Sequence, residues 1–253
     1  MAVNFVNLSE SEFLSEKKLI YKYMTLENAL SSLENNSLWF CNPKEWQDPF
    51  ERRFVEASYK NNSTGKITKF PWLDKSFCCC MTQTTVSEAF WNAYSNGTIG
   101  ISFRFYRDKL LGALKKSNCD IYIGKVEYMK TNDIEKDLHL IPFHGGNNKY
   151  PSKNFLARLM MLKRIAFSYE DEIRIIIVKN KKTKSQGFSL NLNCMMSDLV
   201  KSIYIDPKVG DNTAEMLKET LIRKYNFSSL KPGEYRVMKS NLYTPKSNVT
   251  INI

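Results

Sequence analysis

The stretch from Tyr21 to Glu51 constrains the fold more than any other part of this sequence. It begins with an apolar and aromatic run of strand length, residues 19–23, and Thr25 follows where the N-cap of a helix is expected. Apolar residues then recur at helical spacing from Leu26 to Leu33. Asn35-Asn36 ends this pattern with residues that tolerate the left-handed conformation of a helix C-terminus. The sequence therefore predicts a strand followed by a capped helix.

A second strand and an aromatic turn complete the stretch. Ser37 to Cys41 has strand length, and Asn42-Pro43 and Asp48-Pro49 then force turns, because the residue before a proline avoids the helical conformation. The aromatic residues near these turns are Trp39, Phe40, Trp46 and Phe50. Two interpretations stay open: an aromatic core with a salt bridge, or a site in which Lys22 and the acidic turn hold a planar ligand.

The rest of the chain alternates between short helical and strand patterns. We expect helices at 87–97, 108–116, 152–165 and 213–225, and strands at 76–81, 99–105, 121–128, 167–178, 188–192, 200–205, 235–238 and 249–253. With 253 residues and 43% hydrophobic content, one large core is feasible, and we expect a single domain over 1–253. Residues 1–18 form its polar N-terminal segment, and 208–253 its C-terminal helix and edge strands. The expected class is α+β, with mixed, mostly antiparallel sheets and flanking helices.

The late strand carries a charged pair. Ile173, Ile175 and Ile177 alternate with other residues, so if they face the core, Glu172 and Arg174 share the opposite face. The pair is either an exposed ion pair of small energetic value or part of a functional site. Helical periodicity before it places Lys163 and Arg164 on a surface that faces water.

Charge and cysteine usage narrow the classes of partner. The formal net charge of +11 favours an anionic partner such as nucleic acid, or serves solubility alone. A basic turn with Lys181, Lys182 and Lys184 is the candidate nucleic-acid contact, with a solvated hairpin as the alternative. Six cysteines without a C-x-x-C pair favour a reduced, cytoplasmic protein without structural zinc.

Several common functions are disfavoured. No apolar run reaches the length of a membrane span, and the first residues lack a signal-peptide pattern. Neither a G-x-G-x-x-G motif nor a P-loop is present, which disfavours Rossmann-type cofactor binding and Walker-type phosphate chemistry. We expect no metal site at His139 and His144, which are predicted to lie on the surface.

Several blocks resemble a bacterial family known as domain of unknown function 2971. They are Lys22-Tyr23, Leu38-Trp39-Phe40, Gln47-Asp48-Pro49-Phe50-Glu51, Trp91-x-x-Tyr94, Gly100-Ile101-Ser102-Phe103 and Tyr169-Glu170-Asp171-Glu172-Ile173-Arg174. Gln47 stands where the family has asparagine, and Ile173 where it often has tryptophan. The resemblance covers Tyr21 to Pro207 and implies no activity.

The first block is also similar to the opening of ADP-ribosyltransferases, which implies a split core, NAD as substrate and a toxin or anti-phage effector. In those enzymes a polar residue on the first strand precedes a threonine, and a glutamate lies on a late strand; the counterparts are Lys22 or Tyr23, Thr25 and Glu172. The implied catalytic residues are Glu172 and, for orienting an acceptor, Glu170. The implied NAD contacts are Lys22, Tyr23, Thr25, Phe40, Trp46, Asp48, Glu51, Arg52 and Arg174.

Three functions follow as alternatives. The first is an NAD-dependent ADP-ribosyltransferase that modifies a nucleic acid, with RNA favoured, or a protein, and that has an antitoxin or chaperone partner. The second is a non-enzymatic nucleic-acid-binding module. The third is a metal-dependent nuclease that uses the carboxylates Asp48, Glu51, Glu170 and Glu172.

Overall fold

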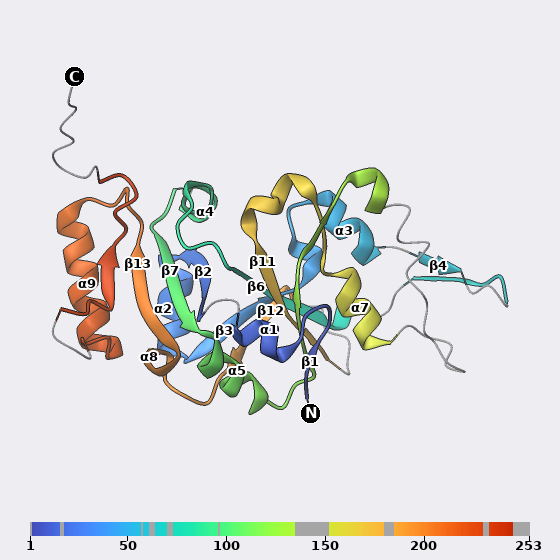
Figure 1. The fold of residues 1–253 in the computed structure, drawn as a ribbon, viewed down its shortest axis with the longest axis horizontal. Helices are drawn as coiled ribbons and strands as arrows, with labels where there is room; N and C mark the ends of the chain where they lie inside the picture. Colours follow the sequence, from blue (N-terminus) through green and yellow to red (C-terminus); the bar gives the residue numbers. More distant parts are fainter. Residues whose placement is uncertain are drawn as a thin grey trace, which may run out of the picture.

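A computed structural model shows a large, mostly antiparallel sheet with helices around it (Figure 1). The structure describes residues 2–15, 18–56, 58–60, 64–69, 73–95, 97–134, 152–179, 185–229 and 233–244. Within these residues the main sheet contains β1 (Val3–Phe5), β2 (Leu19–Thr25), β3 (Ser37–Cys41), β6 (Ser76–Thr82), β7 (Gly100–Tyr106), β8 (Ile121–Lys125), β11 (Glu172–Val178), β12 (Gly187–Asn191), β13 (Val200–Ile205) and β14 (Val237–Lys239). Two small sheets pair β4 (Ser58–Lys60) with β5 (Ile67–Lys69), and β9 (Glu127–Met129) with β10 (Leu162–Arg164). The expected α+β class is confirmed.

Helices surround the sheet. They are α1 (Glu10–Ser15), α2 (Leu26–Glu34), α3 (Pro49–Glu56), α4 (Glu88–Tyr94), α5 (Arg107–Lys115), α7 (Lys153–Leu159), α8 (Met196–Leu199) and α9 (Asp211–Tyr225). Short 3-10 helices are η1 (Pro43–Glu45), η2 (Leu73–Lys75) and η3 (Ile165–Glu170). In the described part of the chain, no helix combines the length and apolar character needed to cross a membrane.

The main sheet forks at β6. Its strand order is β1-β8-β11-β6-β2-β7-β13-β14, and β3 pairs with both β6 and β12. β2 meets β6 only at the pair Tyr21–Thr82, whereas β3 meets the same strand at Cys41–Cys78. Between these two pairs, β2 and β3 diverge. Figure 1 shows the resulting two parts, with β2, β7 and β13 on one side and β6 and β11 on the other.

The local signals in the Tyr21–Glu51 stretch act as predicted. The Thr25 hydroxyl accepts a hydrogen bond from the backbone N–H of Asn28, 3.3 Å away, and caps α2. Asn36 adopts a left-handed conformation with φ of 46° just beyond that helix. The isoleucines of β11 at 173, 175 and 177 lie in the main core, as expected from their alternation.

Three predicted elements are wrong in extent. The helix expected over 152–165 ends at Leu159, because the Met161 backbone carbonyl accepts from Glu127 and the chain continues as β10 beside β9. The strand expected from 167 starts at Glu172, because η3 and a left-handed Asp171 precede it. The strand expected over 121–128 is divided at Val126 into β8 and β9. In α9, Met216 is 72% exposed although the helical periodicity of 213–225 predicts that it faces the core.

Some sequence-based predictions fall outside the described residues. They are the basic turn with Lys181, Lys182 and Lys184, the two histidines His139 and His144, and the strand at 249–253. All six cysteines are free thiols, and Cys78 and Cys79 are buried in β6, as predicted for an apolar strand.

Candidate active site at the fork of the sheet

A pocket of about 670 Å³ opens where β2 and β6 diverge. Tyr21 and Tyr23 of β2 and Cys80 to Thr82 of β6 line one side. The turn from Glu45 to Glu51, which the sequence singled out, lines another, and α4 and η3 form the rim. The pocket therefore joins the first block of the sequence to the late strand β11.

Arg174 holds two glutamates at the pocket floor. Its Nε lies 2.9 Å from Glu172 Oε1, and its Nη2 lies 3.0 Å from both Glu172 Oε2 and Glu51 Oε2. Its Nη1 donates to the Met160 carbonyl at 2.5 Å. With a side chain only 1% exposed, Arg174 has every terminal nitrogen committed within the protein. The Glu172–Arg174 pair, for which an exposed position was one of the two interpretations, is therefore buried, and Arg174 also binds Glu51.

Lys163 adds the second positive charge. Its Nζ lies 2.5 Å from Glu170 Oε2, 3.2 Å from Glu172 Oε2 and 3.2 Å from Glu51 Oε1, and its side chain is 11% exposed. Glu51, Lys163, Glu170, Glu172 and Arg174 are called the floor cluster below. Three carboxylates thus share two cations, so the fully ionised cluster carries one excess negative charge.

Glu170 and Glu172 differ in the direction in which the floor cluster shifts their pKa values. Burial, opposed by the Lys163 charge and reinforced by Glu172, raises the pKa of Glu170 to about 7. Burial also opposes ionisation of Glu172, but the charges of Arg174 and Lys163 outweigh it and hold the pKa of that carboxyl well below its usual range. At neutral pH Glu172 is therefore ionised, whereas Glu170 is partly protonated.

Aromatic side chains form the walls. Tyr23 stacks on Phe90 with ring centroids 5.0 Å apart, and its hydroxyl donates to the Thr85 carbonyl at 3.3 Å. The Trp46 ring lies 4.3 Å from the Arg174 guanidinium carbon. The ring centroids of Tyr169 and Phe90 lie 6.4 Å apart, so η3 and α4 face each other across the rim. Such walls suit a flat, cationic or electron-poor ring.

The acidic turn is fixed by Arg164. Its Nη2 lies 3.0 Å from Asp48 Oδ1, and its guanidinium carbon lies 4.1 Å from the centre of the Phe50 ring. Asp48 Oδ1 also accepts from the Phe50 backbone N–H at 2.9 Å. The Asp48 carboxylate therefore anchors the first turn of α3 beside β10.

The structure brings most predicted site residues to this pocket. Those that line it are Tyr23, Trp46, Asp48, Glu51, Glu170, Glu172 and Arg174. Phe40 is instead fully buried in the main core, Thr25 caps α2, and Lys22 donates to the Cys80 carbonyl at 3.2 Å. These three and Arg52 do not line the pocket. Glu170, expected on the strand with Glu172, lies at the end of η3, because the left-handed Asp171 interrupts the strand.

Sequence reasoning missed Lys163, Arg164 and the rim residue Tyr94. The two cations were placed on the wet face of an overlong helix, whereas β10 directs them to the floor cluster and to Asp48. A usable signal was present: two basic residues closely precede the acidic run from Glu170 to Glu172. Among the residues that the structure describes, no group of histidine, cysteine and carboxylate side chains could hold a metal ion.

Comparisons with known proteins add three similarities. The model of the family described as "Protein of unknown function (DUF2971)" matches residues 90–175, from α4 to β11, and confirms the resemblance over that range. The protein described as "Probable serine/threonine-protein kinase HSL1" from Saccharomyces cerevisiae is 29% identical over 113 residues. That match includes 44% of this chain and only 7% of the kinase chain.

Among solved structures, DarT from Thermus sp. 2.9 in complex with NAD+ resembles this chain at 10% identity and a TM-score of 0.37. The comparison covers 89% of this chain and 96% of that chain. Similarity at this level is too low to place residues of one chain on those of the other.

Proposed function

We propose that the protein is an NAD-dependent ADP-ribosyltransferase whose pocket receives the nicotinamide end of NAD. The observation that carries the proposal is an aromatic pocket whose floor holds two glutamates of opposite protonation behaviour, Glu170 and Glu172. Five acidic side chains and three basic ones line the pocket, so its lining charge is −2 when all are ionised. This charge suits the cationic nicotinamide ring and disfavours the pyrophosphate, which is expected to lie outside the floor.

The reaction needs stabilisation of positive charge more than acid catalysis at the leaving group. The bond from ribose C1 to the nicotinamide nitrogen breaks, both electrons go to the ring, and nicotinamide leaves as a neutral molecule. The sugar passes through an oxocarbenium-like state, which a fixed carboxylate stabilises. Glu172 has that role in the proposal because Arg174 and Lys163 keep it ionised and oriented.

Glu170 has the second role. A nucleophilic oxygen or nitrogen of the acceptor attacks C1 and loses a proton, which the Glu170 carboxylate accepts. A pKa of about 7 matches this task, because a base is most effective near the working pH. The net charge of +11 supports a nucleic acid as acceptor, with RNA favoured, and a toxin or defence role is the corresponding biological hypothesis.

The test follows nicotinamide release from NAD with RNA, DNA or protein supplied as acceptor. Glu172→Gln keeps the shape and removes the charge, and we expect a loss of about 100- to 1000-fold in rate. Glu170→Gln should lower the rate and remove the rise in rate near pH 7. The matched control is Glu219→Gln on the outer surface of α9, which should change neither the rate of nicotinamide release nor its pH dependence.

One outcome would contradict the proposal, and a second measurement then decides what replaces it. If wild-type protein neither binds NAD in a thermal-shift assay nor releases nicotinamide with any acceptor, the ADP-ribosyltransferase function is wrong. If binding of RNA or DNA persists in that case, with a steep salt dependence, the nucleic-acid-binding module replaces it.

A further inference from the structure

The segment Thr82 to Thr84 forms hydrogen bonds with the backbone of residues 169–171, which includes Glu170 and directly precedes Glu172. The Gln83 backbone N–H donates to the Asp171 carbonyl at 3.0 Å, and the Thr84 hydroxyl donates to the Tyr169 carbonyl at 3.4 Å. The Thr82 hydroxyl donates to the carbonyl of Glu170. Three successive carbonyls, at 169, 170 and 171, are therefore bound by three successive residues of one segment.

This backbone needs external support because it departs from regular structure. Asp171 has φ of 41° and ψ of 56°, a left-handed conformation that aspartate tolerates better than most residues but that still costs free energy. The turn ends η3 and starts β11 within one residue. The glutamates on the two sides of this turn both contact Lys163.

Gln83 connects this turn to the core through its side chain. Its Nε2 donates to Asp171 Oδ1 at 2.9 Å, and its Oε1 accepts from Arg107 Nη2 at 2.6 Å. The amide orientation is unambiguous, because a guanidinium only donates and a carboxylate only accepts. Gln83 is 1% exposed and its bond to Arg107 is buried, whereas the Asp171 side chain is 33% exposed and its Oδ1 also lies 3.9 Å from Lys125 Nζ.

Arg107 is itself immobilised. Its Nη1 donates to the Phe13 carbonyl at 2.7 Å, its Nε donates to the Leu19 carbonyl at 3.1 Å, and it is 1% exposed. These carbonyls belong to α1 and β2, outside the pocket. A chain of hydrogen bonds, buried at Arg107 and Gln83, therefore runs from the start of β2 to Asp171.

We propose that Gln83 is a positioning residue, which through Asp171 sets the separation of the Glu170 and Glu172 carboxylates around Lys163. Gln83 does not line the pocket, so its effect is transmitted by the turn and not by contact with a ligand. Of the measurements below, only that of turnover depends on the proposed function. The protonation of Glu170, measured in the protein without NAD, tests it independently.

The main variant is Gln83→Glu. The new carboxylate keeps an acceptor for Arg107 but repels Asp171, so the side-chain bond to the turn is lost while the backbone bond to the Asp171 carbonyl remains. The added charge also acts directly on Glu170, and the Asp171→Asn and Asp171→Gly pair below, in which the charge is the same, separates that effect from positioning. We expect the titration midpoint of the Glu170 carboxyl, followed by carbon-13 NMR and assigned with Glu170→Gln, to move by at least about half a pH unit. Nicotinamide release should fall by about 10- to 100-fold, because small displacements of reacting groups are costly.

Exchanging donor and acceptor should reverse the effect. In the double variant Gln83→Glu with Asp171→Asn, the new amide can donate to the new carboxylate, and asparagine also tolerates the left-handed conformation. The Glu170 midpoint and the turnover should return toward the wild-type values. The matched control is Gln186→Glu. Gln186 is exposed, its Nε2 lies 3.5 Å from Glu45 Oε2, and it receives the same change.

A second pair of variants avoids dependence on the folding of Gln83→Glu. Asp171→Asn and Asp171→Gly both remove the charge and permit the left-handed turn, but only asparagine retains an acceptor for Gln83. We expect the glycine variant to show the larger shift of the Glu170 midpoint.

The inference is wrong if Gln83→Glu lowers the melting temperature but leaves the Glu170 midpoint unchanged, or if the exchanged pair restores nothing. Equal midpoints in Asp171→Asn and Asp171→Gly would also overturn it. If wild-type protein releases no nicotinamide while the midpoints shift as expected, the proposed function fails and the positioning role stands.

Discussion

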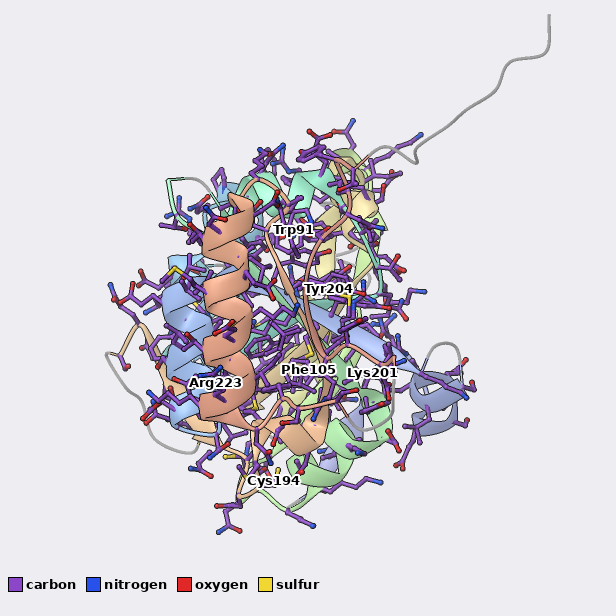
Figure 2. All side chains as sticks on the ribbon, turned by 90° about the vertical axis from the view of Figure 1, so that its left-hand side faces the viewer. Trp91, Phe105, Cys194, Lys201, Tyr204 and Arg223 are labelled. Atoms are coloured by element: carbon purple, nitrogen blue, oxygen red, sulfur yellow. The ribbon has the colours of Figure 1, made fainter. Side chains whose placement is uncertain are left out.

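The floor cluster and the ion pairs of α9 show how surroundings change the value of the same charges. Arg174 and Glu172 have side chains only 1% and 5% exposed, whereas Arg223 and Glu219 on α9 are 81% and 60% exposed. Figure 2 shows α9 on the outside of the sheet, with Arg223 at its surface. Water screens the pair on α9, whereas the floor cluster has lost most of its hydration and depends on its internal partners.

The comparison indicates why the floor cluster is informative about function. Replacing buried ion pairs by apolar residues is often neutral or stabilising, so such a cluster is weak evidence of a stability role. The opposite face of β11 shows the alternative, since Ile173, Ile175 and Ile177 fill the main core without any charge. Under the proposed function, the charges of the floor cluster are retained because they take part in the chemistry of the pocket beside them.

The largest expected effect is that of Arg174→Met. Removal of the guanidinium leaves Glu51 and Glu172 without their main buried partner, and we expect a loss of about 3–5 kcal/mol in unfolding free energy. Urea denaturation at pH 7 measures it. Arg223→Met on α9 is the matched control and should change the free energy by less than about 0.5 kcal/mol. Equal effects of the two variants would refute the contrast between the regions.

The pH dependence of Glu170 sharpens the contrast. Its pKa in the folded protein, about 7, lies above the ordinary value of 4.5, so the folded state binds the extra proton between these values. The contribution of Glu170 to stability is complete below about pH 4.5 and is lost as pH rises through 7. We expect a loss on the order of 2 kcal/mol relative to Glu170→Gln, from denaturation curves between pH 4.5 and 8. Parallel curves for the two proteins would contradict the raised pKa.

The smallest expected effect is that of Glu219→Ala. Its Oε2 lies 3.7 Å from Arg223 Nη2 in an (i, i+4) pair on the solvent side of α9. The free energy of unfolding should change by no more than about 0.5 kcal/mol, and less at high salt. A change above 1 kcal/mol in 0.5 M salt would show that this pair is not screened as its exposure indicates.

The sequence by itself determined the local elements and the residue chemistry. The Thr25 cap, the stop at Asn36 and the core isoleucines of β11 follow from preferences that act over a few residues. The same alternation placed Glu172 and Arg174 on one face. The alternation did not determine whether that face of β11 contacts water or another part of the chain.

Only the tertiary structure decided which charges meet. Lys163 reads as a solvated helix residue, because the carboxylates that hold it come from α3, η3 and β11. Phe40 and Trp46 are both aromatic residues near one turn, yet Phe40 lies in the main core and Trp46 lines the pocket. The left-handed conformation of Asp171 could not be predicted from the sequence, since aspartate only tolerates it and the bond to the Asp171 side chain comes from Gln83 in a distant segment. Local preferences fix elements over a few residues, whereas burial and ion pairing depend on contacts between segments that the chain brings together only when it folds.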